Sequence, residues 1–293
     1  MKICCTIILT GLLFQFAKAQ IFVRADTLGA LINPQPVVGK IFYNMTWLRD
    51  TTKPDSLYHE QFELDLGKTM SCYFSYYAKE RDIKTIQHLE QAMQAGKILS
   101  PPPGISIPMG IAGEGNQIIG SRDLFFTDND NDTRMMYIWS SEFLIKDTDE
   151  KINWEILDST KNIKGNLCQK ATGESHGRTY TAWFCSDLPY SFGPRRLHGL
   201  PGLILEAYDE KREIVYTLDH IEKATSGQVG FPKRAIATTD TKFYKALDAY
   251  DKNPEAFTNP GAPAANSINS KLPSHIGNYD RKKFIPNNPI DLK

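Results

Sequence analysis

Apolar and polar residues alternate with a period of two along most of the chain, as in β-strands that have one buried and one solvated face. The pattern first appears in Ile41, Tyr43, Met45 and Trp47. Further strands are expected at Arg134–Ile138, at Phe143–Ile145, around Ile152, Trp154 and Ile156, and at Leu167–Thr172 facing Thr179–Phe184 across a turn at Gly173–Gly177.

The alternation also predicts the register of two hairpins. A three-residue turn at Gly67–Thr69 keeps both apolar sets on one face of the sheet, whereas a two-residue turn would place them on opposite faces. It sets Leu66 against Met70, Leu64 against Cys72 and Phe62 against Phe74. In the second hairpin, a polar turn at Asp209–Arg212 pairs Ala207 with Ile214, Leu205 with Tyr216 and Leu203 with Leu218.

Two segments have the periodicity of helices. Asp82–Ala95 carries apolar residues on one helical face (Ile83, Ile86, Leu89 and Met93), and Gly96 is placed to end the helix. Asp240–Tyr250 predicts a shorter helix, and Ser100–Gly120, rich in Pro and Gly, predicts a long loop. We therefore expect a mainly β fold: a single curved, largely antiparallel sheet or partly closed barrel with one or two packed helices.

The first 19 residues have the pattern of a secretory signal peptide. Lys2 precedes the apolar run Ile7–Phe16, which Ala17-Lys18-Ala19 follows as a cleavage site. The run is too short to span a bilayer of about 30 Å, and no transmembrane segment is expected in the mature chain. We expect residues 20–258 to form a single β-rich domain. Residues 259–293 read as an irregular tail, either disordered or draped over that domain.

Composition narrows the class of function. The 34 basic and 34 acidic residues balance, so nucleic acid is not an expected partner. The hydrophobic content of 41% is enough for a buried core. After cleavage three cysteines remain, Cys72, Cys168 and Cys185, which leaves two alternatives: buried thiols, or one disulfide and a leftover thiol.

The segment from Cys168 to Ile204 has an unusual composition, with Cys168-Gln169-Lys170-Ala171, Gly177-Arg178, Ala182-Trp183, Asp187-Leu188-Pro189, Gly193-Pro194 and Gly199-Leu200-Pro201-Gly202-Leu203-Ile204. It closely resembles the GLPGLI family of exported proteins from Bacteroidota, and the resemblance continues to Asn288-Pro289-Ile290. Cys185 departs from the family pattern. The resemblance implies export, to the periplasm or the outer membrane of a Gram-negative bacterium, and a single-domain organisation. It implies no reaction, because the family has no established activity.

Physical chemistry gives the last hexapeptide a structural role. Pro201-Gly202 is suited to the middle of a type II turn, with Gly at the position of positive φ. Leu203 and Ile204 then enter a buried strand. The motif residues to which we assign this role are Cys168, Lys170, Gly193, Pro194, Gly199, Leu200, Pro201, Gly202, Leu203 and Ile204.

Ligand-binding candidates lie in the same segment. The side chains of Arg178, Arg195, Arg196 and His198 can converge on an anionic group through bidentate guanidinium contacts. The alternative is a solvated basic loop. Trp183, with Trp154, is a candidate for an apolar ligand on the concave face of the sheet, the alternative being ordinary core.

Motifs for catalysis and metal binding are absent from the sequence. Asp128–Asp132 has the rhythm of a calcium loop, yet Thr133 and Trp139 replace the Gly and Glu that an EF-hand needs, so a polar hairpin tip is favoured. No zinc, serine-hydrolase or phosphate-loop motif occurs. Structural thiols are favoured at Cys168 and Cys185, the alternative being a thiol nucleophile with His176 or His198 as base. We assign no catalytic residue, metal or cofactor.

These observations predict a non-enzymatic envelope factor, a binding or accessory module. Its candidate partners are an outer-membrane or envelope protein and an apolar or anionic small molecule. A periplasmic hydrolase is the alternative, favoured by a pocket that joins a thiol or carboxylate to a histidine within hydrogen-bond reach. A purely structural interaction protein is the third class. On the binding hypothesis, Arg178→Ala weakens binding without lowering the melting temperature, whereas an equal loss of both would make Arg178 structural.

Overall fold

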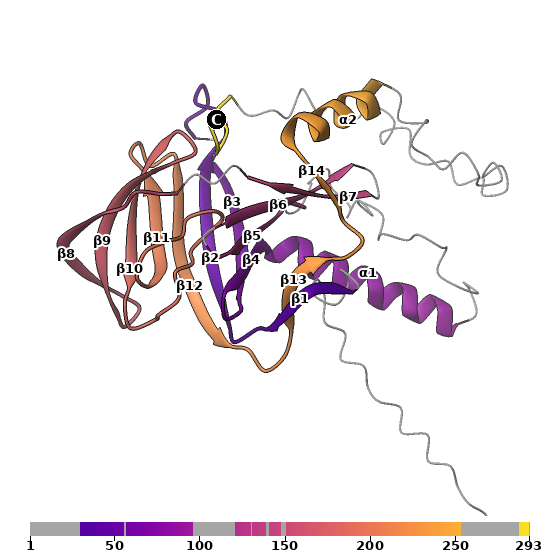
Figure 1. Ribbon diagram of the computed structural model, residues 1–293, viewed down its shortest axis with the longest axis horizontal. Coiled ribbons are helices and arrows are strands. Elements are labelled where there is room, and N and C mark those ends of the chain that lie inside the picture. Colours follow the sequence, from indigo (N-terminus) through magenta and orange to yellow (C-terminus); the bar gives the residue numbers. More distant parts are fainter. Residues whose placement is uncertain are drawn as a thin grey trace, which may run out of the picture.

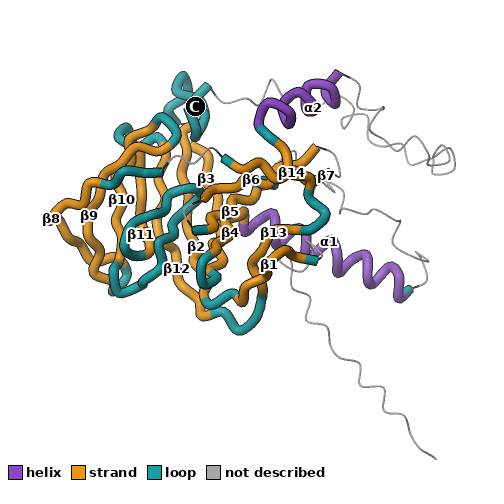
Figure 2. The backbone as a smooth tube through the Cα atoms, in the orientation of Figure 1, coloured by secondary structure: helices purple, strands orange, loops and turns teal. Residues whose placement is uncertain are grey.

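The computed structural model describes residues 30–55, 57–95, 121–129, 131–138, 141–147, 151–252 and 287–292. These residues form fourteen strands and two helices (Figure 1, Figure 2). The strands are β1 (Leu31–Pro36), β2 (Gly39–Leu48), β3 (Leu57–Leu66), β4 (Met70–Ser75), β5 (Leu124–Asp128), β6 (Asn131–Ile138), β7 (Ser141–Lys146), β8 (Glu155–Ile163), β9 (Asn166–Ser175), β10 (Arg178–Cys185), β11 (Leu203–Asp209), β12 (Ile214–Lys223), β13 (Gln228–Pro232) and β14 (Ile236–Thr238). The helices are α1 (Tyr76–Gln94) and α2 (Asp240–Lys252).

Twelve strands form one curved sheet in the order β14-β7-β6-β5-β4-β3-β2-β12-β11-β10-β9-β8. All neighbours are antiparallel except β14 and β7, and the sheet does not close into a barrel. Figure 1 shows β8 to β12 curving around beside β2, while β5 to β7 extend the sheet to the other side. The expected mainly β, curved, largely antiparallel fold is therefore confirmed. β1 and β13 form a separate two-stranded sheet, which the sequence pattern did not predict.

The first hairpin prediction is wrong in register by one residue, because β4 is buried on both faces. Leu66 pairs with Ser71 and Leu64 with Tyr73, not with Met70 and Cys72. The side chain of Tyr73 belongs to the main core, whereas Met70, Cys72 and Phe74 pack in a second cluster with Val37 and Val229. A strand with apolar residues on both faces gives no alternation from which a register can be read.

Two other turns differ from expectation. Ala207 pairs with Tyr216, not Ile214, a slip of two residues that keeps every side chain on its predicted face. The carboxylate of Asp209 accepts the Ile214 N–H at 2.8 Å and fixes this turn. The turn between β9 and β10 contains only His176 and Gly177, both with positive φ, which is typical of a type I′ hairpin.

Helix α1 begins six residues before its predicted start, because Ser75 caps it. The Ser75 hydroxyl accepts the Ala78 N–H at 3.0 Å, as an N-cap residue does. Helix α2 begins at its predicted residue and buries Phe243 against β6 and β7. β8 begins only at Glu155, so Ile152 and Trp154 precede it. The signal segment, Gly96, the loop Ser100–Gly120 and most of the C-terminal tail lie outside the described residues.

Candidate functional site

Residues Asn287–Leu292, here called the strap, lie across one end of the curved sheet. Figure 1 shows them in yellow at the ends of β2 and β3. The Trp47 indole donates to the carbonyl oxygen of Asn288 at 2.9 Å, and the Asn288 side-chain amide donates to the carbonyl oxygen of Leu48 at 2.7 Å. Ile290 packs against the main core. The end of the C-terminal tail is thus draped over the domain.

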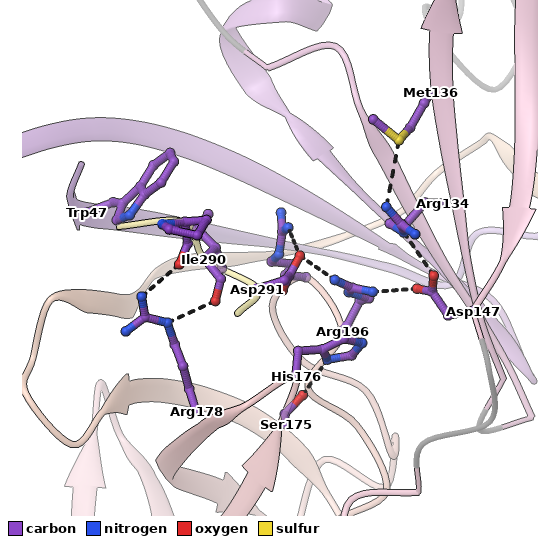
Figure 3. A network of polar contacts seen from close by, with 12 residues as sticks. Trp47, Arg134, Met136, Asp147, Ser175, His176, Arg178, Arg196, Ile290 and Asp291 are labelled. Atoms are coloured by element: carbon purple, nitrogen blue, oxygen red, sulfur yellow. Dashed lines mark hydrogen bonds and ion pairs between the residues drawn. The ribbon is translucent and has the colours of Figure 1, made fainter. Parts of the chain in front are cut away.

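Arg178 is the first residue of β10, and each of its guanidinium N–H donors has an acceptor. Figure 3 shows its side chain directed toward Ile290 of the strap. A guanidinium group has five N–H donors. Three bonds reach the strap: from Nε to the Ile290 carbonyl oxygen at 2.9 Å, and from Nη2 to the Pro289 carbonyl oxygen at 2.7 Å and to Asn288 Oδ1 at 2.5 Å. Nη1 donates to the carboxylates of Asp209 at 2.9 Å and Glu213 at 3.4 Å. Because β10 begins where β11 ends, these partners meet at the same end of the sheet.

Arg195 and Arg196 converge on the carboxylate of Asp291. Arg195 Nη2 donates to Asp291 Oδ2 at 2.5 Å, and Arg196 Nη2 forms an ion pair with the same oxygen. Burial alone would raise the pKa of Asp291, but the charges of Arg195 and then Arg196 outweigh it and hold that pKa well below its ordinary value. In the structure the anionic group that the two arginines contact thus belongs to the chain itself.

The network continues from Arg196 to the other half of the sheet. Arg196 Nη1 donates to Asp147 at 2.5 Å, and Asp147 also accepts from Arg134 at 2.9 Å. Arg134 in turn donates to Asp240, at the start of α2, at 2.6 Å. His198 contacts the Asp132 carboxylate at 3.3 Å. This chain of charges joins β6, the segment after β7, the strap and α2.

The two predicted groups of candidates are separated by the fold. Arg178, Tyr180 and Ala182 are buried on one face of β10, whereas Trp183 is half-buried on the other. The Lys161 ammonium lies 4.4 Å from the Trp183 ring centroid and forms an ion pair with Glu206 at 2.7 Å. Lys170 is the β9 neighbour of Trp183. Trp183 therefore does not share a site with the arginines.

The hexapeptide is a packed corner, as its structural interpretation predicts. A Cβ atom on Gly202 would lie 2.2 Å from the carbonyl oxygen of Cys185, and one on Gly193 would lie 2.7 Å from that of Leu197. Gly199 has a φ of 87° and donates its N–H to Ser191 at 3.0 Å. The Gly202 N–H bonds to the Leu200 carbonyl at 2.8 Å, so the corner is tighter than the type II turn expected. Leu200, Leu203 and Ile204 are buried, Pro201 is exposed and Pro194 is buried before the Arg195 turn.

The titratable pairs that a hydrolase would use are buried in structural contacts. Burial, and then the neighbouring Cys185, raises the pKa of the Cys168 thiol to about 12, which disfavours the thiolate that a nucleophile needs. The side chains of His198 and Asp132 are only 3% and 9% exposed. Ser175 Oγ lies 2.8 Å from His176 Nδ1, and burial, with the charge of Arg196, lowers the pKa of His176.

Several site residues could not be identified from local patterns. Trp47 and Asp291 bind across more than 90 residues of sequence, and the one signal for the strap was the resemblance at Asn288-Pro289-Ile290. The buried polar atoms that lack a hydrogen-bond partner within the described part of the chain include Arg195 Nε, Arg196 Nε, Tyr73 Oη, Tyr216 Oη and Trp183 Nε1. Within these same ranges no three potential metal ligands cluster. No helix there is long and apolar enough to cross a membrane.

Comparisons with known proteins find a short family match. Residues 173–206 match the model of a family described as a protein of unknown function, Porph_ging. No curated protein matches. Two solved structures of PNGF-II, in space groups C2 and P21, are similar with TM-scores of 0.47 and 0.45, 11% identity and coverage of 72% and 71% of this chain. The alignments cover 32% of the PNGF-II chain, so this protein spans about a third of its length. The chain is thus similar, over the stretch that carries Arg178, Arg195, Arg196 and the hexapeptide, to a family of unknown function.

Proposed function

We propose that this chain is an exported, non-enzymatic binding module of the GLPGLI type, whose strap site holds an extended peptide segment carrying a carboxylate. The observation that carries the proposal is the convergence of Arg195 and Arg196 on the carboxylate of Asp291. The strap is then the resident occupant of a peptide site. A segment of similar sequence in an envelope partner is the ligand, and the periplasm or outer membrane is the compartment.

The contacts support recognition of a peptide. Trp47 and Arg178 bind three consecutive strap carbonyls, and the Leu292 N–H donates to the His176 carbonyl at 3.0 Å. Such main-chain bonds provide affinity for an extended segment, and side-chain contacts provide specificity. The specific contacts here are made by the Asn288 amide and the Asp291 carboxylate. The unpartnered Nε atoms of Arg195 and Arg196 offer donors for a further acceptor on the ligand.

The strap competes with any incoming segment because it is part of the same chain. Tethering gives it a high effective concentration at the site. Binding in trans therefore requires a ligand that outcompetes the strap, or a partner that loosens it first. The proposal predicts that weakening the strap's own contacts increases the affinity for added peptide.

The test uses the full mature chain and a fluorescent peptide with the sequence of residues 286–293. A variant with Asn288→Ala and Asp291→Ala keeps the site but loosens the strap. We expect it to bind the peptide at least about tenfold more tightly than the unmodified chain, as measured by fluorescence anisotropy. Adding Arg196→Ala should abolish the gain, because Arg196 contacts the peptide carboxylate.

Asp187→Ala, an exposed carboxylate near the same corner, serves as the matched control and should leave peptide binding unchanged. Circular dichroism checks that each variant is folded. If the loosened, folded chain binds no peptide, the site is a fixed structural clamp and the proposed function is wrong.

A further inference from the structure

Cys168 and Cys185 are brought together by the pairing of β9 and β10. Trp183 lies opposite Lys170 and Phe184 opposite Gln169, so the next pair in this register is Cys185 and Cys168. Directly opposed residues of antiparallel strands have Cα atoms about 4.5 or 5.5 Å apart, and both separations are within the range of disulfides. Neither thiol is exposed, and both are free in the structure.

The third thiol is excluded as a partner by its place in the fold. Cys72 is on β4 in the cluster with Met70 and Phe126, whereas Cys168 and Cys185 belong to the main core. After burial, the neighbouring Cys185 is the main cause of the raised pKa of the Cys168 thiol, as expected for adjacent side chains. The structure thus decides between the pairings that the sequence left open.

We propose that Cys168 and Cys185 form a cross-strand disulfide when the chain folds in an oxidising compartment, while Cys72 stays reduced. The inference rests on the export that is part of the proposed function. Each thiol loses its proton and one Sγ–Sγ bond forms. The two electrons reduce the disulfide of an exchange partner, a thiol–disulfide oxidoreductase or oxidised glutathione, to two thiols through a mixed disulfide.

The bond would join the two strands beside the hexapeptide corner. Gly202 packs against the carbonyl group of Cys185. Leu203 pairs with Cys185 across β10 and β11. A disulfide here would restrict the end of β10 on which the corner rests. Because neither thiol is exposed in the folded chain, the exchange has to precede the final packing of the sheet, and oxidation of the reduced folded protein should be slow.

The experiment refolds the full mature chain from the reduced, denatured state in a buffer of reduced and oxidised glutathione. The product is then denatured, alkylated and digested without reduction. We expect alkylation at Cys72 alone, and a linked peptide pair containing Cys168 and Cys185 that disappears on reduction. Cys72→Ala should keep the linked pair. Cys185→Ala should leave two alkylated thiols.

The digest of the unmodified chain decides the outcome even if a variant fails to fold. Three alkylated cysteines, or a linked pair that contains Cys72, would overturn the assignment. The measurement is independent of the peptide-binding assay, so failure of the disulfide and failure of the strap site are distinguishable. The oxidised chain should also unfold at a higher urea concentration than the reduced chain, because the bond restricts the unfolded state.

Discussion

At the strap, the carboxylate of Asp291 lies between two guanidinium groups, whereas beside helix α1 two carboxylates lie next to each other. Glu63 and Asp65 share the Lys40 ammonium, at 2.5 and 2.8 Å, and Lys79 of α1 donates to Glu63 at 2.5 Å. Both clusters are largely buried. At the strap one carboxylate has two guanidinium groups, whereas beside α1 two adjacent carboxylates share an ammonium group.

The difference appears in the pKa values. The arginines hold the pKa of Asp291 far below its ordinary value. Burial, and then the charge of Glu63, raises the pKa of Asp65 to about 7, although Lys40 opposes the shift. Two adjacent carboxylates cannot both ionise at low cost, so one of them keeps its proton. The strap cluster is thus stable in charge over a wide pH range, while the cluster beside α1 changes charge near neutrality.

The largest effect is expected from Arg178→Ala. The substitution leaves Asp209 buried without its cation and removes three bonds to the strap. We expect the free energy of unfolding to fall by about 3–5 kcal/mol, the usual cost of breaking a buried ion pair. Urea unfolding measures the loss, with the exposed Lys211→Ala as control. This outcome replaces the expectation from sequence that Arg178→Ala leaves the melting temperature unchanged.

If Arg178→Ala keeps the stability of the unmodified chain and loses only peptide capture, Arg178 is a ligand-binding residue and not a clamp. Arg195 and Arg196 differ from Arg178 in the use of their donors. Their Nε atoms lack partners within the described residues, whereas Arg178 has a partner for each donor.

Sequence reasoning succeeded where one face of a strand is buried and failed where burial is two-sided or contacts are remote. The β2 alternation from Ile41 to Trp47 gave the strand correctly. In β4 both faces are buried, so the register could not be read from the pattern. In the β11–β12 hairpin the faces were right, but the pairing is shifted by two residues, and the Asp209 carboxylate accepts the Ile214 N–H in the turn.

The candidate site shows the same limit. The residue types of Arg195 and Arg196 led to the prediction of an anionic ligand, and in the structure both contact a carboxylate of the chain itself. That the anion is Asp291, 96 and 95 positions away, follows only from the fold. Trp183 was predicted, with Trp154, for a separate apolar ligand, and alternation along β10 directs it to the face opposite Arg178.

The second prediction tests the cluster beside α1 by pH. The folded-state pKa of Asp65 is about 7, above the ordinary carboxyl value near 4. Between about pH 4 and pH 7, Asp65 therefore carries a proton in the folded chain that it lacks in the unfolded chain. The stability that this proton contributes is complete below about pH 4 and is lost as the pH rises through 7. We expect the free energy of unfolding to fall by about 2 kcal/mol between pH 5 and pH 8.

Asp65→Asn should flatten this pH dependence, because an amide does not titrate, while Asp187→Asn should keep it. Urea unfolding at pH 5, 6, 7 and 8 gives the profile for each chain. A slope that survives in Asp65→Asn would assign the titration to another group and remove the contrast between the clusters.

The smallest effect is expected from Asp291→Asn. The amide oxygen still accepts a hydrogen bond, and Arg196 keeps Asp147 at 2.5 Å, so only the charge assistance is lost. We expect the free energy of unfolding to decrease by about 1 kcal/mol at pH 7, with faster proteolysis of the C-terminus as the strap loosens.

Because the arginines lower the pKa of Asp291, the contribution of its carboxylate to stability is present above the ordinary carboxyl pKa and decreases as the pH falls below that value. The difference between Asp291→Asn and the unmodified chain should therefore shrink from pH 7 to pH 3, opposite in sign to the trend for Asp65. An equal difference at both pH values would mean that the strap is held by its main-chain bonds, and not by the arginine pair.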